Sequence, residues 1–568
     1  MSNSSRKSSL EAGVERTQEV QQNFSNEDQE LPLESDNADP LQLEKRLSRD
    51  LADSHDNILS IGKLIAVLLS LSLSIFLSFV DQTAIPNLLP SIADDLNAHS
   101  TISWAGTSLY ISNTVFMVLF GRFSDIFSRK YVLLFSLVIL GFMELACGFA
   151  QTPYQFYLFR GLCGVGAGGV NSLTNTIVSD VVTLKERGKY QGVLGLFVGL
   201  GNALGPFLAS AFVMHLSWRK FFWALCPLIL CSACIVYAFV PYTHTGYNFK
   251  LKLLQVDYPG FFTSAVAIIF TLIPLSGGGS SFEWNSAFSI SFFCIGGVFF
   301  VLFILNEKFV AKLPLLPLHL FQTNISLTAL LSQNFFLGTS YFSTLYYTPY
   351  YLQVVRGFSI LRSAEFMLSF VIIQATCSVI SGQIVSRTGH YLHVIWFGYI
   401  FWAVGTSLCF LWHTDTKNGV IIGTNLVQGI GIGSIFQTTI VAAQAQSYKK
   451  DRAVIISTRN FLRFLGAAVG LAICSTILSN SYLKILRKDG SNVGLTQTEI
   501  ASLGKLVYSQ DISLTGYTTD QVKFLKIAYM TSLRHVYSFI VASAGCCLLS
   551  TSFVRDNGVQ PLDVPREK

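Results

Sequence analysis

The sequence predicts an all-α integral membrane protein with fourteen membrane-spanning helices and both termini in the cytosol. Of its 568 residues, 51% are hydrophobic and 13% are charged, and this charged fraction is about half of that in a soluble protein. Fourteen apolar runs are long enough to cross a bilayer. An even number of spans places both termini on one side. Most Lys and Arg residues of the short loops fall on that side, which the positive-inside rule assigns to the cytosol.

The apolar runs divide the chain into six helices, an added pair and six further helices. The predicted spans are 62–84, 103–121, 131–150, 154–178, 189–212, 219–241, 258–276, 287–305, 327–350, 364–384, 392–412, 419–442, 454–478 and 531–552.

The domain boundaries follow from these runs. Residues 1–57 are polar and lack the apolar core of a signal peptide, so we expect a disordered cytosolic tail. The remaining predicted parts are an N-terminal six-helix bundle (58–243), an inserted pair with its linkers (244–326), a C-terminal six-helix bundle (327–555) with a long non-cytosolic loop at 480–529, and a cytosolic tail (556–568).

A charged decapeptide, Gly121 to Lys130, separates the second and third runs. We expect it to form a tight cytosolic loop, in which Gly121 allows two helices to approach closely. Asp125 is placed to face a helix N-terminus, and Arg129 and Lys130 can pair with acidic groups and hold the loop at the cytosolic surface. The alternative is an ordinary basic loop that only obeys the topology rule.

This segment resembles the loop signature of the major facilitator superfamily, and further motifs resemble its fungal fourteen-helix drug:proton antiporters. That group also contains vacuolar importers of basic amino acids. The matching stretches, in chain order, are Asp81–Thr83 with Leu89–Pro90, Arg160 with Gly164 and Gly166, Gly201–Pro206, Trp218–Arg219, Tyr347–Ser359 and Arg459–Gly466. The resemblance covers roughly residues 58–555 and implies that fold, with a substrate site between the two bundles near the middle of the membrane.

Three ionisable residues within predicted spans are candidates for proton coupling, because a charge inside a bilayer is costly and usually functional. Asp81 lies in the first run, Glu144 in the third and Arg160 in the fourth. Protonation of Asp81 would remove the cost of moving it between differently hydrated states. Each residue also has a structural alternative, in which it only ties one helix to a neighbour.

The fifth run carries Gly201, Gly205 and Pro206, which match the antiporter motif of the family. The resemblance associates this motif with the direction of transport. Plain helix packing through small residues explains it equally well.

Several polar and aromatic residues of the second bundle are candidates to line the substrate cavity, and each could instead join two helices or belong to an interfacial belt. They are Asn334, Tyr347, Tyr351, Gln353 and Gln437.

These features favour a proton-coupled antiporter that works by alternating access. The leading hypothesis is efflux of drugs and toxins across the plasma membrane, and the alternative is import of basic amino acids into the vacuole. A membrane sensor is less favoured, because the predicted C-terminal tail is short. We do not expect the protein to be an enzyme, because the sequence lacks a catalytic pair of nucleophile and base. We do not expect a nucleotide-driven pump either, because the sequence lacks a phosphate-binding loop.

The expected partners are a small-molecule substrate, protons and the lipid bilayer. We expect no cofactor and no metal, because the eleven cysteines form no ligand pattern. The basic residues are spread over loops, so the net charge of +6 does not indicate nucleic acid. We expect a monomer.

Overall fold

The computed structural model describes residues 60–98, 101–102, 104–182, 184–242, 257–278, 283–311, 314–316, 318–448, 452–505 and 517–558. All of them belong to one compact unit formed by residues 54–568. The predicted tail 1–57 lies outside the described residues, as does the predicted tail 556–568 beyond residue 558.

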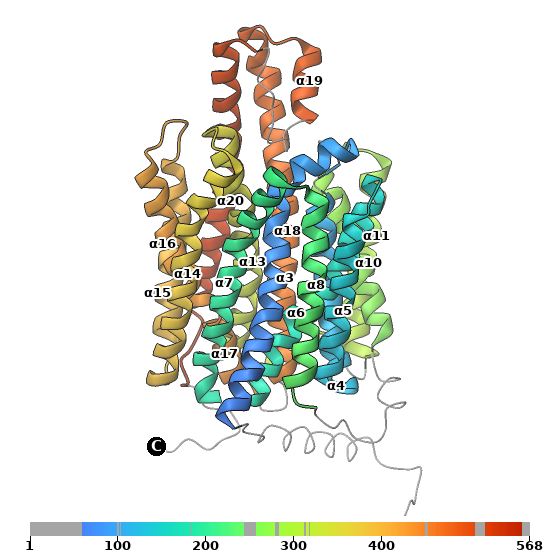
Figure 1. Ribbon diagram of the computed structural model, residues 1–568, viewed down its shortest axis with the longest axis vertical. Helices are drawn as coiled ribbons and strands as arrows, with labels where there is room; N and C mark the ends of the chain where they lie inside the picture. The colour runs from blue at the N-terminus through green and yellow to red at the C-terminus, as the bar shows by residue number, and fades with distance from the viewer. Residues whose placement is uncertain are drawn as a thin grey trace, which may run out of the picture. The chain divides into compact units, whose positions relative to one another are not determined.

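The described part of the chain is helical, and its long helices run side by side in Figure 1. In chain order they are α3 Ile61–Leu96, α4 Trp104–Phe127, α5 Arg129–Gly148, α6 Pro153–Val181, α7 Leu184–His215, α8 Trp218–Phe239, α10 Tyr258–Gly277, α11 Ala287–Phe309, α12 His319–Thr323, α13 Ile325–Tyr350, η2 Tyr351–Val355, α14 Ile360–Thr388, α15 Leu392–Leu408, η3 Cys409–Leu411, α16 Asn418–Phe436, α17 Thr438–Ala445, α18 Arg452–Asp489, η5 Gly490–Val493, α19 Gln497–Lys505 and α20 Thr519–Thr551.

Eleven helical segments of the described residues are long and apolar enough to cross a membrane, so the chain is a multi-pass membrane protein. Three further long helices, α4, α6 and α13, have 24, 29 and 26 residues and are not among the eleven. A helix overlies each of the fourteen predicted runs. The count of fourteen spans and the cytosolic termini stay predictions.

Polar residues between the apolar runs begin several helices by accepting hydrogen bonds from the free N–H groups of the first turn. Thr152 accepts from the Gln155 N–H at 3.4 Å, and Pro153 opens the helix behind it. Thr518 forms a capping box with Gln521 at the start of α20. These caps fix where the chain turns from a loop into a helix.

The helices form two groups that we call the N half (α3–α8) and the C half (α13–α20). The halves meet where α7 packs against α14 and where α4 packs against α18. On the first of these contacts, a Cβ atom added to Gly188 would lie 2.9 Å from the carbonyl oxygen of Gly382. Glycine therefore lets the two backbones approach closely.

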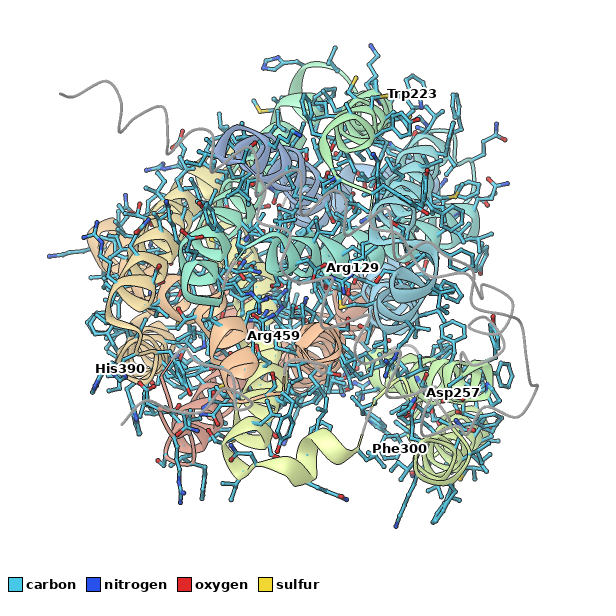
Figure 2. All side chains as sticks on the ribbon, turned by 90° about the horizontal axis from the view of Figure 1, so that it is seen from below. Arg129, Trp223, Asp257, Phe300, His390 and Arg459 are labelled. Atoms are coloured by element: carbon cyan, nitrogen blue, oxygen red, sulfur yellow. The ribbon has the colours of Figure 1, made fainter. Side chains whose placement is uncertain are left out.

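The added pair, α10 and α11, packs together, and α10 contacts α4 and α18. Most of α11 is exposed, with Phe300 at 55% and Val298 at 58%, and Figure 2 shows Phe300 at the edge of the molecule. Asn306 joins the pair by donating hydrogen bonds to both carboxylate oxygens of Asp257, each at 2.8 Å. The exposed apolar side chains of α11 suit contact with lipid.

The segment 480–529, predicted as a long non-cytosolic loop between two spans, is largely helical where it is described. Helix α18 continues to Asp489 and α20 begins at Thr519, and Figure 1 shows both extending with α19 past the ends of the other helices. The rings of Tyr482 and Tyr529 pack edge to face at 5.5 Å. This packing supports helices beyond the apolar runs, where hydropathy alone predicts none.

Candidate functional site

Three charged side chains from three helices of the N half converge in its interior. Arg160 of α6 donates from Nη1 to Asp81 Oδ1 of α3 at 2.6 Å and to Glu144 Oε1 of α5 at 3.3 Å. Asp81 and Glu144 are 0% exposed and Arg160 is 1% exposed. All three residues proposed from sequence for proton coupling therefore lie in one cluster.

The charge cluster has one guanidinium for two carboxylates. The second oxygens, Asp81 Oδ2 and Glu144 Oε2, have no hydrogen-bond partner within the described residues, and neither has Arg160 Nε. With both carboxylates ionised the cluster carries a net charge of −1, and uptake of one proton makes it neutral. The arrangement is therefore chemically able to bind and release a proton.

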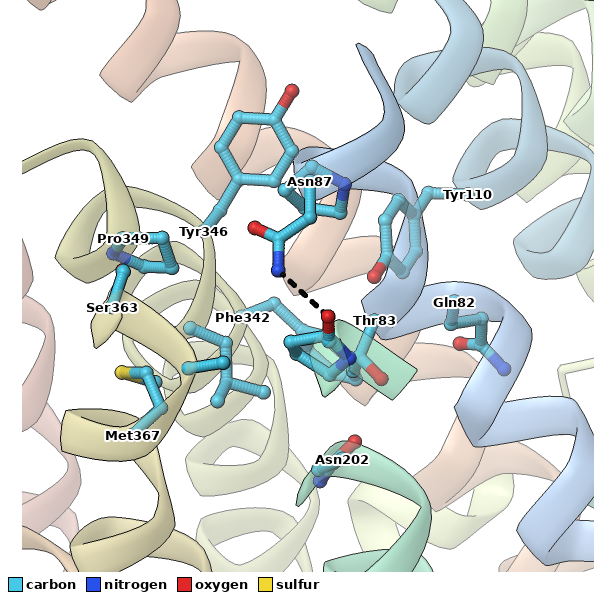
Figure 3. A pocket seen from close by; sticks show the side chains of 14 residues that line it. Gln82, Thr83, Asn87, Tyr110, Asn202, Phe342, Tyr346, Pro349, Ser363 and Met367 are labelled. Atoms are coloured by element: carbon cyan, nitrogen blue, oxygen red, sulfur yellow. Dashed lines mark hydrogen bonds between the residues drawn. The ribbon is translucent and has the colours of Figure 1, made fainter. Parts of the chain in front are cut away.

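A cavity with about 530 Å³ of empty volume lies between the two halves (Figure 3). Four of its sides are formed by the second part of α3, the middle of α7, the end of α13 and the start of α14. The lining residues are Gln82, Thr83, Pro86, Asn87, Tyr110, Asn202, Pro206, Phe342, Leu345, Tyr346, Pro349, Ser363, Ala364 and Met367.

Two residues connect this inter-half cavity to the charge cluster. Gln82 follows Asp81 in α3, and its amide donates to the Ser78 carbonyl at 3.0 Å. Tyr110 of α4 lines the cavity and interacts electrostatically with both Asp81 and Arg160. Two polar side chains of the cavity lining, a phenol and an amide, thus lie near the cluster.

The motif residues of α7 pack against α3 beside this cavity. A Cβ on Gly201 would lie 2.8 Å from the Phe76 carbonyl oxygen, and one on Gly205 would lie 2.7 Å from the Val80 carbonyl oxygen. Pro206 lines the cavity, and its carbonyl accepts from Asn87 Nδ2 at 3.3 Å, as the dashed line in Figure 3 shows. Packing accounts for both glycines, and the link to transport direction stays a prediction.

A polar bridge joins the halves beneath the cavity. Asn202 of α7 donates from Nδ2 to the Tyr341 hydroxyl of α13 at 2.6 Å, and Gln374 of α14 donates to the same oxygen at 3.1 Å. Figure 3 shows Asn202 at the lower side of the cavity, and its Oδ1 has no hydrogen-bond partner in the described part of the chain.

The cavity residues proposed from sequence lie elsewhere, since none of the five lines this cavity. Asn334 bonds to the Leu330 carbonyl at 2.7 Å, and the ring of Tyr351 stacks on Trp412 at 4.7 Å, with its hydroxyl on the His413 carbonyl. Their alternative role as ties between segments fits these contacts.

The other three are also buried away from the cavity. Tyr347 is 1% exposed, and its ring lies edge to face with Tyr346, which does line the cavity. Gln353 sits in the π-helical turn η2, where its amide has no hydrogen-bond partner in the described residues. Gln437 lies at the junction of α16 and α17, facing Gly195 of α7.

Sequence reasoning missed most of the cavity lining, including Asn87, Phe342, Ser363 and Met367. Asn87 falls beyond the predicted end of the first span, whereas α3 continues to Leu96. The others are ordinary neutral side chains of apolar helices. The family motifs did mark the neighbourhood, since Gln82, Thr83 and Asn202 belong to matched stretches.

The decapeptide Gly121 to Lys130 is not a loop, which corrects the prediction. Helix α4 continues to Phe127 and α5 starts at Arg129, so only Ser128, with φ 77°, separates them. Asp125 therefore lies within α4, and its side chain is outside the described part. Charged residues at a membrane surface do not end a helix by themselves, because they remain solvated there.

Of the other residues of this segment, Arg129 and Gly121 make the expected types of contact, whereas Lys130 lies over an aromatic ring. Arg129 forms an ion pair with Asp180 at the end of α6. Lys130 lies 5.0 Å from the ring centroid of Tyr237. Gly121 packs against Ser457 of α18, so it lies on a contact between the halves.

At the end of the bundle away from the cavity, hydrogen bonds join the two halves. Arg187 of α7 donates from Nη1 to Gln444 Oε1 of α17 at 3.1 Å, and Gln444 donates to Ser179 Oγ of α6 at 3.2 Å. The hydroxyl oxygens of Ser172 and Ser457 are 3.4 Å apart. The halves are therefore joined at this end and separated by the cavity at the other.

No group of three His, Cys, Asp or Glu residues able to hold a metal ion occurs among the described residues. The polar groups around the cavity are amides, hydroxyls and the nearby charge cluster, which are suited to binding an organic molecule and a proton.

Comparison with known proteins agrees with a transporter. The chain is 45% identical over 511 residues to Citrate exporter 1 of Yarrowia lipolytica, covering 89% of this chain and 75% of that protein. It is 35% identical over 506 residues to the MFS-type transporter clz4 of Cochliobolus lunatus, covering 89% and 88% of the two chains.

A solved structure of a bacterial homologue of the human lysosomal transporter Spinster has the same fold, with a TM-score of 0.58 at 15% identity, over 87% of this chain and 98% of that one. The curated relatives are named as transporters, so this protein moves small molecules across a membrane and is not an enzyme. A family model matches residues 71–471, and the chain belongs to the Major Facilitator Superfamily.

Proposed function

We propose that this protein is a proton-coupled antiporter that exports a small organic carboxylate by alternating access. The observation that carries the proposal is the buried cluster of Asp81, Glu144 and Arg160, with Tyr110 and Gln82 of the inter-half cavity near it. Proton-driven carriers commonly contain a carboxylate within the membrane that protons reach through neighbouring polar side chains.

The cluster supports proton coupling through its charge balance. In the neutral form it contains one ion pair and one protonated carboxyl, whereas loss of the proton leaves a net charge of −1 in a dry interior. The stability of each form depends on hydration, which changes when the halves move. Release of the proton toward one side and uptake from the other then drives the cycle.

The cavity lies near the end of α3 and the start of α14, which the predicted topology places away from the cytosol. The contacts of Arg187, Gln444 and Ser179 close the opposite end. This arrangement corresponds to an outward-facing conformation. The inward-facing conformation requires these bonds to break and the cavity side to close.

The substrate class comes from the relatives. Citrate exporter 1, at 45% identity, makes citrate or a related carboxylate the first substrate to test. Drug efflux is the second candidate, because the cavity has an apolar, aromatic part formed by Phe342, Tyr346 and Met367, and a relative 29% identical is named Efflux pump dotC. Import of basic amino acids remains a third alternative, with location in the vacuolar membrane instead of the plasma membrane.

The test is flux in proteoliposomes under an imposed pH gradient, with radiolabelled citrate, a fluorescent cationic drug and lysine as separate substrates. We expect citrate flux to rise with the gradient in the intact protein. In Asp81→Asn we expect flux that no longer responds to the gradient. Flux of citrate that ignores the gradient in the intact protein would contradict proton coupling, and drug or lysine flux without citrate flux would contradict the carboxylate.

A further inference from the structure

Two buried arginines lie one helical turn apart in α18, and they differ in what they contact. Arg459 donates to the Phe436 carbonyl, to Thr439 Oγ1 at 2.8 Å and to Asn460 Oδ1 at 2.9 Å. These bonds hold the junction between α16 and α17, where backbone carbonyls lack helical partners. Arg459 thus has a structural role, and Figure 2 shows it near the centre of the molecule.

In the described part of the chain, no hydrogen bond from the Arg463 guanidinium to a comparable partner is present. Arg463 is 3% exposed, and within the described residues it forms no ion pair, while its Nε and Nη1 have no hydrogen-bond partner. Its guanidinium carbon lies 4.3 Å from the ring centroid of Phe436 and 5.2 Å from that of Phe464. An arginine buried in a membrane protein without an anionic partner is costly, and a ligand carrying negative charge would offset that cost.

The position of Arg463 is that of a substrate site. It follows the start of α18 at Arg452 by eleven residues, about 16 Å at 1.5 Å per residue, which is roughly halfway across a 30 Å hydrocarbon core. Tyr341 belongs to the polar bridge between the halves. Phe436 packs against both Tyr341 and Arg463, with 5.3 Å between its ring and that of Tyr341.

The bridge supplies a second donor. The Tyr341 oxygen accepts from Asn202 and Gln374, whereas its own O–H reaches Gln374 Oε1 only at 3.4 Å. The O–H can therefore turn toward a ligand at little cost. A guanidinium and a phenol from facing helices suit a carboxylate, which accepts several charge-assisted hydrogen bonds.

We propose that Arg463 and Tyr341 form a carboxylate-binding subsite beneath the inter-half cavity, specific for organic anions with two or more carboxyl groups. This subsite rests on the proposed function and deepens it. The ligand enters when the polar bridge of Asn202, Tyr341 and Gln374 opens. One carboxylate pairs with Arg463, and the others extend toward the cavity, where Asn202 Oδ1 can meet a ligand hydroxyl.

The experiment measures citrate flux in proteoliposomes with Arg463→Gln, Arg463→Lys and Tyr341→Phe. Loss of a charged hydrogen-bonding partner predicts an increase of at least about tenfold in the KM of Arg463→Gln, a smaller increase for Arg463→Lys and little change in maximal flux. Arg362→Gln is the matched control, because Arg362 is an exposed residue of the same half, stacked on Phe358 at 4.4 Å. It should behave as the intact protein.

A binding measurement on the unaltered protein covers the case in which Arg463→Gln fails to fold. Citrate should raise the unfolding temperature, and its neutral trimethyl ester should not, because only the ionised form pairs with Arg463. Equal stabilisation by both compounds would overturn the subsite.

The outcomes separate the two proposals. If the intact protein moves citrate and Arg463→Gln does so with unchanged KM, the subsite is wrong and the exporter stands. If the intact protein moves only neutral or cationic substrates, the carboxylate exporter is wrong and the subsite falls with it.

Discussion

Arg160 is the cation shared by two buried carboxylates, and its removal should show how strongly the charge cluster depends on it. Arg160→Gln leaves Asp81 and Glu144 facing each other without a cation, so we expect a loss of about 3–5 kcal/mol in the free energy of unfolding. The thermal unfolding midpoint in detergent measures this loss. The triple variant with Asp81→Asn and Glu144→Gln removes all three charges and should recover most of the stability.

Failure of the triple variant to recover would mean that Arg160 acts through packing, for example against Phe222, whose ring centroid lies 5.9 Å from its guanidinium carbon. The cluster would then have no special electrostatic role.

Glu499 at the start of α19 is a residue whose effect should depend on pH. The Thr496 backbone N–H and hydroxyl both donate to Glu499 Oε2 at 2.7 Å, and these bonds lower the pKa of the Glu499 carboxyl below its ordinary value of 4.5. A lowered pKa in the folded state means that the bonds stabilise the helix start above the ordinary pKa. This stabilisation is lost as the pH falls through the lowered value.

The protection of α19 amides from hydrogen exchange, corrected for the intrinsic rate at each pH, should therefore be higher at neutral pH than in acid, and Glu499→Gln should reduce this difference. An acid response of α19 that is the same in Glu499→Gln would assign the effect to other groups.

At the scale of elements, the contact between α13 and α18 positions the proposed subsite, because Tyr341 and Arg463 belong to these helices. The two helices can pack closely because α18 has a glycine at this contact. A Cβ on Gly470 would lie 2.8 Å from Thr339 Cα, so Gly470→Ala must push the helices apart. We expect a cost of about 1–3 kcal/mol in the free energy of unfolding.

Gly297 in α11 is the matched control, since no atom lies within 4 Å of a Cβ added there. Gly297→Ala should be neutral or should stabilise α11 by up to about 1 kcal/mol, through helix propensity. Equal losses at Gly470 and Gly297 would contradict the role assigned to close packing.

The presence of each long helix could be predicted from the sequence, because a long apolar segment in a membrane has few options other than to form a helix. Helix ends could not. The segment from Gly121 to Phe127 was predicted to be a loop because it carries charges, yet helix α4 continues through it and ends only before Ser128. The continuation of α18 to Asp489 and the start of α20 at Thr519 were missed, because packing between these helices, not hydropathy, maintains them.

The charge cluster could be predicted because Asp81, Glu144 and Arg160 interrupt apolar runs, where a charge is rare and costly. The cavity could not, because a neutral polar side chain in a span serves equally well as a tie. Gln353 illustrates this: the π-helical turn η2 rotates its backbone, and nothing in a single sequence marks that turn. Tyr346 lines the cavity while its neighbour Tyr347 does not, and the difference is set by the rotation of α13.

At the scale of the whole molecule, transport by alternating access requires movement of the N half against the C half. The contact between α6 and α18 must separate for the substrate to enter from the predicted cytosolic side. The Ser172 and Ser457 hydroxyls, 3.4 Å apart, lie on this contact, so a pair of cysteines there should form a disulfide when oxidised.

The most direct measurement is substrate flux by Ser172→Cys/Ser457→Cys in proteoliposomes, before and after oxidation and again after reduction. Single-cysteine variants and the unaltered chain serve as controls. They are needed because the sulfur atoms of the native Cys147 and Cys163 lie 3.9 Å apart and could also be oxidised. We expect flux to stop on oxidation of the double variant alone and to return on reduction. Undiminished flux, with mass spectrometry confirming that the engineered disulfide has formed, would contradict alternating access between the two halves.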